Sequence, residues 1–219
     1  MLQLMKITAM TLLIGLGMQT IPATAQDAYS TKPVTNHGKK WRIGYYEGGS
    51  YINYPINLRT IVAGLAELGW MDPVAIPAAD DQTLAKPLWD YLVRHIKSDY
   101  IQFVADGFWS CSWDSEKRKQ TKEEIIQRLN QNKDIDFMIA MGTWAGKDLA
   151  TDRHHTPTMV LSASDPLSAG IIKSVEDSGF EHLHAAFNDV DIVRQFFCPN
   201  LFFLSMLSHV FYFSLIFYQ

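Results

Sequence analysis

One stretch, residues 135–170, constrains the fold of this chain more than any other. It contains, in order, an apolar run, a small-residue turn, a helical pattern and a second apolar run (135–141, 142–143, 144–152 and 157–161). This order is typical of a βαβ unit, whose two strands lie parallel and buried in a sheet. Ligands of such sheets bind outside the carboxyl ends of the strands. The pattern therefore predicts a binding site at residues 142–143 and at residues 162–165, which follow the two strands.

Strand and helix patterns alternate along the rest of the chain as well. Further strands are expected at 41–46, 73–76, 100–104 and 182–187, and further helices at 55–69, 84–96, 116–130 and 171–175. Asp80 and Asp81 are placed to cap the second of these helices. A polar and aromatic loop is expected at 106–115. This alternation predicts an α/β fold with a doubly wound parallel sheet.

Charge and cysteine content exclude several classes of protein. The net charge is −4 over 219 residues, and the basic residues are scattered, so nucleic acid is not an expected partner. The chain has two cysteines, Cys111 and Cys198, and a disulfide between them is not excluded. Two cysteines do not indicate a fold built on a disulfide framework.

The amino terminus has the features of a secretory signal. Lys6 precedes an apolar core, and Ala23-Thr24-Ala25 places small residues where a signal peptidase reads them. We therefore expect residues 1–25 to be a cleaved signal peptide and the protein to be periplasmic. An uncleaved anchor is the alternative. Residues 26–40 are polar and are expected to form a flexible leader.

The composition changes at residue 196. Residues 196–219 contain no Asp, Glu, Lys or Arg and hold seven of the 12 Phe residues. The first interpretation is that this apolar tail is foreign to the fold, as a frameshift or premature stop would leave it. A membrane anchor and a buried terminal helix are the alternatives. Non-specific membrane contact through the tail is a possible consequence.

Four segments of the chain resemble the exported substrate-binding proteins of ABC transporters, in particular the tryptophan/tyrosine-type group. They are the first strand with its loop, the helix end with Gly69, the turn after residue 141 and the Ser-Asp-Pro turn (42–51, 64–70, 142–145 and 162–170). The resemblance covers residues 41–195. It implies a solute-binding component of an ABC importer, without a catalytic role, that captures an aromatic amino acid or similar molecule and delivers it to an inner-membrane ABC permease.

The resemblance also implies a division of the chain. Members of the family close two α/β lobes on a ligand, and residues 41–188 correspond to the first lobe. Residues 189–195 correspond to the start of the crossing helix, with Asp189 as its N-cap. The apolar tail does not resemble the next strand of a second lobe, so most of that lobe is expected to be missing.

Three loops supply the candidate ligand-binding residues. Gly142 and Thr143 begin a helix after a strand, where free N–H groups can hold a carboxylate. Thr143 as a simple N-cap is the alternative. The second loop contributes hydroxyls, and a carboxylate that can pair with a ligand ammonium group: Ser162, Ser164 and Asp165. The third loop contributes a wall of small residues and a tyrosine that can stack on an aromatic ligand: Gly48, Gly49, Ser50 and Tyr51. Their alternatives are an Asp-capped turn and a surface loop aromatic.

Other motifs point to no cofactor, metal or catalytic set. Residues 47–51 lack both GxGxxG and a phosphate loop, and no serine has a GxSxG context. His154 and His155 are adjacent and diverge on a helix, and His182 and His184 have no nearby third ligand. Trp109 and Trp113 are interpreted as loop packing. Two rival functions stay open: an exported α/β hydrolase with Ser162 or Ser164 as nucleophile, and a sensor domain anchored by the tail.

Overall fold

The computed structural model describes residues 31–77 and 84–186. Its centre is a sheet of five parallel strands in the order β2-β1-β3-β4-β5. The strands are β1 (Trp41–Glu47), β2 (Ile101–Ser110), β3 (Phe137–Met141), β4 (Thr158–Leu161) and β5 (Leu183–Ala185). The helices are α1 (Asn53–Glu67), α2 (Ala85–His95), α3 (Ser115–Gln131) and α4 (Gly142–Leu149). The expected α/β class and doubly wound parallel sheet are confirmed.

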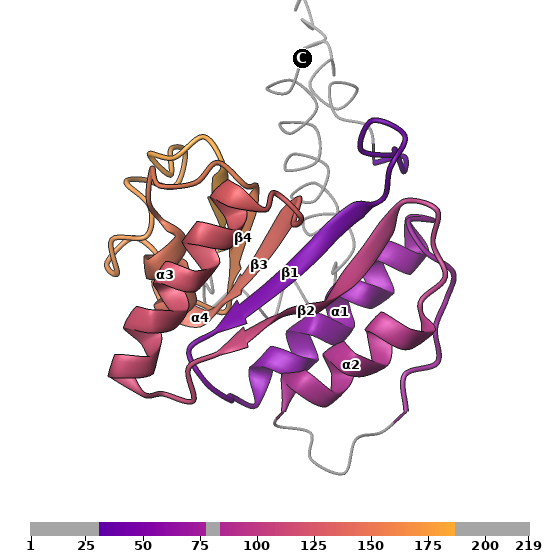
Figure 1. Cartoon of the computed structure of the whole chain (residues 1–219), viewed down its shortest axis with the longest axis horizontal. Helices are drawn as coiled ribbons and strands as arrows, with labels where there is room; N and C mark the ends of the chain where they lie inside the picture. The colour runs from indigo at the N-terminus through magenta and orange to yellow at the C-terminus, as the bar shows by residue number, and fades with distance from the viewer. Residues whose placement is uncertain (1–30, 78–83, 187–219) are drawn as a thin grey trace, which may run out of the picture.

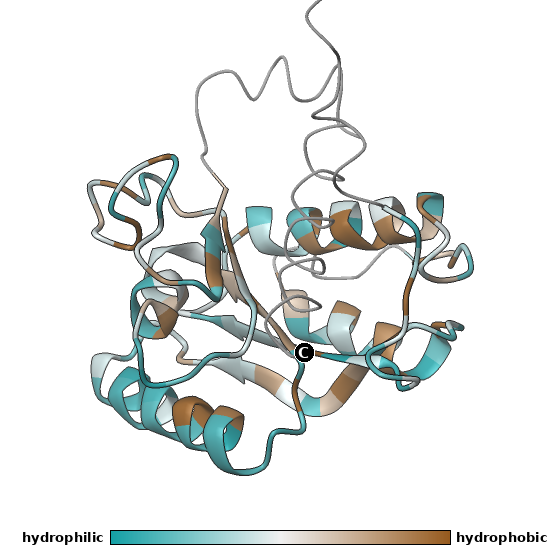
Figure 2. Ribbon diagram, turned by 90° about the horizontal axis from the view of Figure 1, so that it is seen from above, coloured by the Kyte–Doolittle hydropathy of each residue, from teal (hydrophilic) through white to brown (hydrophobic). Residues whose placement is uncertain are grey.

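Helices cover both faces of the sheet (Figure 1). The pair α1 and α2 packs on one face over Ile43, Tyr45 and Ile139, and the pair α3 and α4 packs on the other over Tyr46 and Met138. Alternate residues of each strand point to opposite faces, so each face has its own apolar core. The helices in Figure 2 accordingly carry both apolar and polar residues along their length.

Two helix boundaries follow sequence signals, the end of α1 and the start of α3. Gly69, with φ +76°, follows α1, and its N–H donates to the carbonyl of Ala66. Asp114 caps α3 by accepting from the N–H groups of Glu116 and Lys117. The helix α2 begins at Ala85 with Leu84 as its N-cap. Asp80 and Asp81, which were expected to cap it, lie outside the described residues.

The expected strand at 73–76 is wrong. The position beside β1 belongs to β2, so this segment has no strand to pair with and runs along the outside of α1 and α2. Side chains satisfy its carbonyls instead. The Tyr91 hydroxyl donates to the Ala75 carbonyl at 2.8 Å, and Arg59 donates to the Pro77 carbonyl at 3.1 Å. Val74 and Ile76 are apolar because they pack on the helical layer.

The expected loop at 106–115 is wrong in its first half, because β2 continues to Ser110. Between Phe103 and Phe108 the strand bulges and then resumes its pairing with β1 at Tyr45. Side chains from both faces satisfy the carbonyls of the bulge: Trp89 donates to Val104, and Arg128 donates to Asp106. The bulge places Ser110 beside the end of β1 and carries the next residues to the carboxyl edge of the sheet.

Two further expectations on local structure need correction. The helix expected at 144–152 begins earlier, at Gly142, and ends at Leu149. The segment expected to be a helix at 171–175 is irregular and bent instead. Ile171 and Ile172 bury their side chains in the second core, and both donate their N–H groups to the Pro166 carbonyl. The extended segment at 182–187 is confirmed as β5 over Leu183–Ala185.

Among residues 31–77 and 84–186, no helix combines the length and the apolar character that a bilayer crossing requires. The expected signal peptide at 1–25, most of the leader, the crossing helix at 189–195 and the tail at 196–219 lie outside the described residues.

Candidate functional site

The chain reverses its direction of winding at β1. It leaves β1 to form β2 on one side and then crosses to form β3 on the other, so β1 and β3 flank the topological switch point. Open α/β sheets bind ligands at the carboxyl ends of these two strands. Here β1 ends at Glu47, which is in register with Met141 on β3 and with Ser110 on β2. A glycine follows each of the two switch-point strands, Gly48 after β1 and Gly142 after β3.

Glu47 is a buried acid at the centre of this edge. Its side chain is only 2% exposed, and the Tyr45 hydroxyl donates to its Oε2 atom at 2.9 Å. Burial raises the pKa of Glu47 to about 7, against the opposing effect of hydrogen bonds from Tyr45 and Ser110. Near neutral pH this carboxyl is therefore divided between its charged and uncharged forms.

Tyr54, in the first turn of α1, closes the edge beside Gly142. A Cβ atom on Gly142 would lie 1.9 Å from the Tyr54 hydroxyl oxygen, so a glycine is required at this approach. Burial and the nearby charge of Glu47 raise the pKa of Tyr54 to about 12. Its ring packs edge-on against Tyr51, with 5.4 Å between centroids, and Tyr51 is half exposed.

Trp113 and Trp144 form an aromatic rim above the loop that follows β1. Their rings meet edge-on with 5.5 Å between centroids. The Trp113 indole N–H donates to the Ser50 carbonyl, and its backbone N–H donates to the Gly48 carbonyl. A Cβ atom on Gly49 would lie 2.6 Å from the Trp113 ring, so the loop passes directly under that side chain. Trp113 is 47% exposed.

A buried polar network holds this rim in place. The guanidinium of Arg118 on α3 stacks on Trp144, with its Cζ atom 4.6 Å from the ring centroid. The same guanidinium donates two hydrogen bonds to the Asp148 carboxylate, with N–O distances of 2.8 and 2.9 Å. Asp148 also accepts a hydrogen bond from the Tyr46 hydroxyl at 2.8 Å, and that hydroxyl lies 3.2 Å from the Cys111 sulfur. The network joins α3, α4 and β1 on the face opposite Glu47.

The starts of α1 and α4 both lie at this edge, and neither has a side-chain cap. Ile52 and Met141 occupy the N-cap positions, and neither makes a side-chain cap hydrogen bond. In α1 the Tyr54 N–H donates to the Tyr51 carbonyl and Pro55 has no N–H, so the start of α4 is the more open of the two. Thr143 is the second residue of α4 and is half buried, so it is not the N-cap that the alternative interpretation proposed. Its assignment to ligand binding stays a prediction.

The residues after β4 lie one strand further along the same edge, since Leu161 is in register with Met141. Ser162 has φ +57°, and Ser164 and Asp165 are exposed. The Asp165 carboxylate accepts from the Ser168 N–H at 2.9 Å, and hydrogen bonds to Ser168 lower the pKa of Asp165. This carboxylate caps a turn, as the alternative interpretation proposed, and that does not test its role in binding.

The structure thus brings Gly48, Gly49, Ser50 and Tyr51 together with the start of α4, and places 162–165 beside them. The sequence-based site omitted Glu47 and Tyr54, and it interpreted Trp113 as loop packing. Glu47 carried a usable signal, because it is an acid at the end of an apolar strand and directly before two glycines. Tyr54 and Trp113 carried none, since their place depends on Gly142 and on the β2 bulge.

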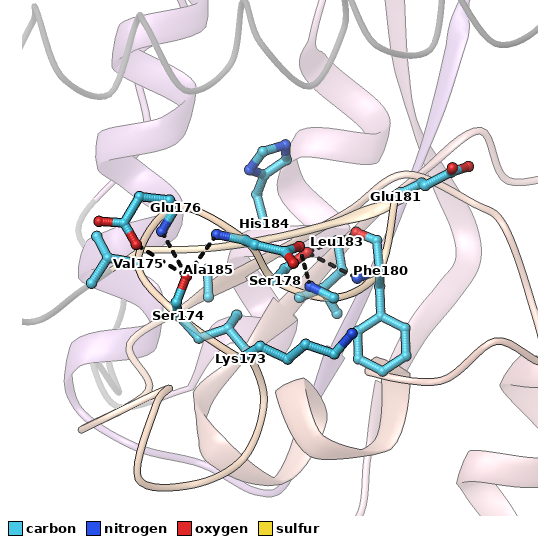
Figure 3. Close-up of a pocket in the computed structure, with 13 residues that line it drawn as sticks. Lys173, Ser174, Val175, Glu176, Ser178, Phe180, Glu181, Leu183, His184 and Ala185 are labelled. Carbon is cyan, nitrogen blue, oxygen red and sulfur yellow. Dashed lines mark hydrogen bonds between the residues drawn. The ribbon is translucent and has the colours of Figure 1, made fainter.

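Two other clusters lie away from this edge. A cavity of about 370 Å³ runs along the edge strand β5 and the loop before it (Figure 3). Its Ser174 and Ser178 side chains hydrogen-bond within their own loop. His154 and His182 lie with 4.5 Å between ring centroids, before β4 and β5, and both rings contact the Leu149 carbonyl.

The position of the histidine cluster bears on the hydrolase alternative. The cluster lies at the amino ends of its strands, whereas Ser162 and Ser164 follow the carboxyl end of β4. In the described part of the chain, no set of three His, Cys, Asp or Glu side chains is placed to hold a metal ion. Cys111 is a buried free thiol, and Cys198 lies outside the described residues.

No protein-family model matches this chain, and no curated protein matches it. Three solved structures resemble part of it. One is an ABC domain in complex with L-Trp from Streptococcus pneumoniae, with 18% identity, TM-score 0.43, and 68% of this chain and 39% of that chain covered. Another is a ligand-free, open substrate-binding protein with adhesive properties from Clostridium difficile, with 16% identity, TM-score 0.44 and coverage of 69% and 40%.

The third structure is a conserved domain protein from Vibrio cholerae, with 10% identity, TM-score 0.45 and coverage of 73% and 43%. This chain therefore spans about two fifths of the length of each of these proteins.

Proposed function

We propose that residues 41–188 form the first ligand-binding lobe of an exported solute-binding protein that serves an ABC importer. The ligand is a small organic molecule with an aromatic body, such as an aromatic amino acid. One observation carries the proposal: a buried acid, the start of α4 without a side-chain cap and an aromatic rim meet at the switch point of a doubly wound sheet.

The proposed site combines a polar floor with an apolar wall. The start of α4, which has no side-chain cap, offers N–H groups that favour a ligand carboxylate. Trp113, Trp144 and Tyr51 offer ring faces and edges for a planar ligand. Binding proteins of this architecture bury their ligand by closing a second lobe over the first. Residues 41–188 by themselves are therefore expected to bind more weakly than a two-lobed protein.

Ligand titration of the full chain tests this proposal. Binding of L-tryptophan and L-tyrosine, measured by ligand-observed NMR, should be saturable. Thr143→Ala should weaken it about 5- to 150-fold, because a buried polar group that loses its partner costs about 1–3 kcal/mol. Exposed Thr60→Ala, on the outside of α1, is the matched control. Absence of binding by any aromatic amino acid at millimolar concentration would defeat the proposal.

Delivery to a permease requires export. A signal peptide at 1–25 places the protein in the periplasm, where an inner-membrane ABC permease is its partner. Mass spectrometry of a periplasmic fraction should find a mature terminus at Gln26. A chain that retains residues 1–25 after translocation contradicts this part of the proposal.

A further inference from the structure

The fold buries two acids among its described residues and treats them differently. Asp148 is 5% exposed and pairs with the guanidinium of Arg118. Glu47 is 2% exposed, and its partners are the hydroxyls of Tyr45 and Ser110. No salt bridge joins Glu47 to another residue in the described ranges. Glutamates are almost never fully buried unless they are paired.

The position of Glu47 explains why a protein would retain such a group. Burying a carboxylate without a cation is costly, so a purely structural site would favour a neutral side chain. Acids with this kind of environment gather at functional sites. Glu47 ends the central strand at the switch point, in register with the ends of β2 and β3. Among the described residues, Glu47 is the carboxyl at the ends of β1 and β3, where a ligand of this edge would bind.

Tyr54 provides the way to the carboxyl. It is 4% exposed, yet its hydroxyl makes no hydrogen bond with another described residue. Its ring packs on Tyr51, which is half exposed at the surface of the edge. Its ring also belongs to the first apolar core and its hydroxyl lies over Gly142, so a ligand reaches Glu47 only if this side chain rotates away.

We propose that Glu47 binds the ammonium group of the ligand, so that the lobe selects small aromatic molecules that carry a cationic amine. This inference rests on the proposed function and names the chemistry of its ligand. The ammonium group donates to the Glu47 carboxylate as Tyr54 moves aside, while the aromatic body lies against Tyr51, Trp113 and Trp144. Asp165 is the less suitable partner, because it is exposed to water and already accepts from Ser168.

Ammonium binding at Glu47 depends on pH, because only the ionised carboxyl pairs with a cation. The groups that face this carboxyl are the Tyr45 hydroxyl on β1, the Ser110 hydroxyl on β2 and the Tyr54 hydroxyl on α1. With the pKa of Glu47 at about 7, the affinity for an amine should rise as pH increases from 6 to 8. The affinity for a ligand without an amine should not follow this rise.

Three indole probes separate the possibilities in the full chain. Tryptamine has the ammonium group without a carboxylate, indole-3-propionate has a carboxylate without an amine, and L-tryptophan has both. Ligand-observed NMR measures their affinities for the unchanged chain, for Glu47→Gln and for Glu124→Gln. Glu124 is the control, since it also accepts a hydrogen bond from an aromatic side chain, the Trp109 indole N–H, but lies exposed on α3. Melting temperatures of all three proteins report folding.

We expect tryptamine to bind at least tenfold more tightly than indole-3-propionate at pH 8. Glu47→Gln should lower the affinity for tryptamine at least tenfold and abolish the increase of that affinity with pH. Glu124→Gln should leave the affinity and its pH dependence unchanged. If Glu47→Gln folds and its affinity for tryptamine lies within twofold of the affinity of the unchanged chain, this inference is overturned and the proposed function is not. Failure of all three probes to bind the unchanged chain overturns the proposed function as well. If Glu47→Gln does not fold, equal affinities for tryptamine and indole-3-propionate at pH 6 and pH 8 overturn the inference.

Discussion

Gly142 is the residue at which backbone geometry and site geometry coincide. Its φ is +85°, which costs other residues about 1–2 kcal/mol, and a Cβ atom would collide with the Tyr54 hydroxyl. Gly142→Ala should therefore lower the free energy of unfolding by about 2–4 kcal/mol, the strain and the overpacking together. Urea denaturation measures this loss.

Gly170 offers a matched control for this prediction. Its φ is +68°, but nothing lies within 4 Å of the position of its Cβ atom. Gly170→Ala should therefore lose only the strain of about 1–2 kcal/mol. Adding Tyr54→Phe to Gly142→Ala should restore part of the loss by removing the hydroxyl. Equal losses for the two glycine variants would show that Tyr54 is not in contact with Gly142.

His154 makes the stability of the lobe depend on pH. Its ring is fully buried, its Nδ1 atom has no hydrogen-bond partner in the described part of the chain, and burial lowers its pKa to about 3. The unfolded chain, with a histidine pKa near 6.5, thus binds the proton more readily than the folded one. The contribution of His154 to the free energy of unfolding is therefore present above pH 6.5. It should be lost as pH falls toward 3, by up to about 1.4 kcal/mol per pH unit.

Glu47 acts with the opposite sign. Its folded pKa of about 7 lies above its ordinary value of 4.5, so its contribution is present below pH 4.5 and is lost as pH rises through 7. Thermal unfolding of His154→Gln and Glu47→Gln between pH 4 and 8 separates the two effects. His154→Gln should flatten the acid side of the profile, and Glu47→Gln the neutral side. An unchanged profile in His154→Gln would mean that this ring is accessible to protons in the folded protein.

At the scale of the element, α3, α4 and β1 are joined by the network around Asp148. This carboxylate is 5% exposed and serves both Arg118 and Tyr46. Asp148→Ala leaves a guanidinium and a buried hydroxyl without their partner, and should lower the free energy of unfolding by about 3–5 kcal/mol. Near-UV circular dichroism should also change, because Arg118 no longer holds the Trp144 ring.

The exposed ion pair of Glu116 with Lys119 on α3 is the control for this element. Both side chains are more than 70% exposed, so Glu116→Ala should cost less than about 1 kcal/mol. A loss for Asp148→Ala as small as that would show that water replaces the network, and that the rim is held by ring packing alone.

At the scale of the whole molecule, the composition of residues 196–219 predicts how the chain behaves in solution. A stretch without charged residues and rich in Phe favours association or membrane contact. Cutting the chain after Gln195 should therefore increase its soluble yield and shift size-exclusion profiles from aggregate to monomer. A clean monomer of the 219-residue chain that binds an aromatic amino acid with micromolar affinity would show that the tail completes the protein.

The sequence by itself determined the local and periodic features of the fold. Apolar runs predicted β1, β3 and β4, helical spacing predicted the four helices, and their alternation predicted a parallel doubly wound sheet. The rule that ligands bind at carboxyl strand ends then selected the loops after β1, β3 and β4 as candidates. The inferences on the fold succeeded because each depends on residues within one element or on neighbours along the chain. The choice of binding loops stays a prediction.

Only the tertiary structure decided the features that depend on distant partners. The segment 73–76 has the apolar residues of a strand but lies outside the sheet, because β2 pairs with β1 instead. The bulge in β2 relies on Trp89 and Arg128 from two helices. Trp113, which follows β2, is held at the edge by hydrogen bonds to the carbonyls of Gly48 and Ser50 in a distant loop. The burial of Glu47 is likewise set by what packs around it, and burial is what turns an ordinary carboxyl into one with a pKa of about 7.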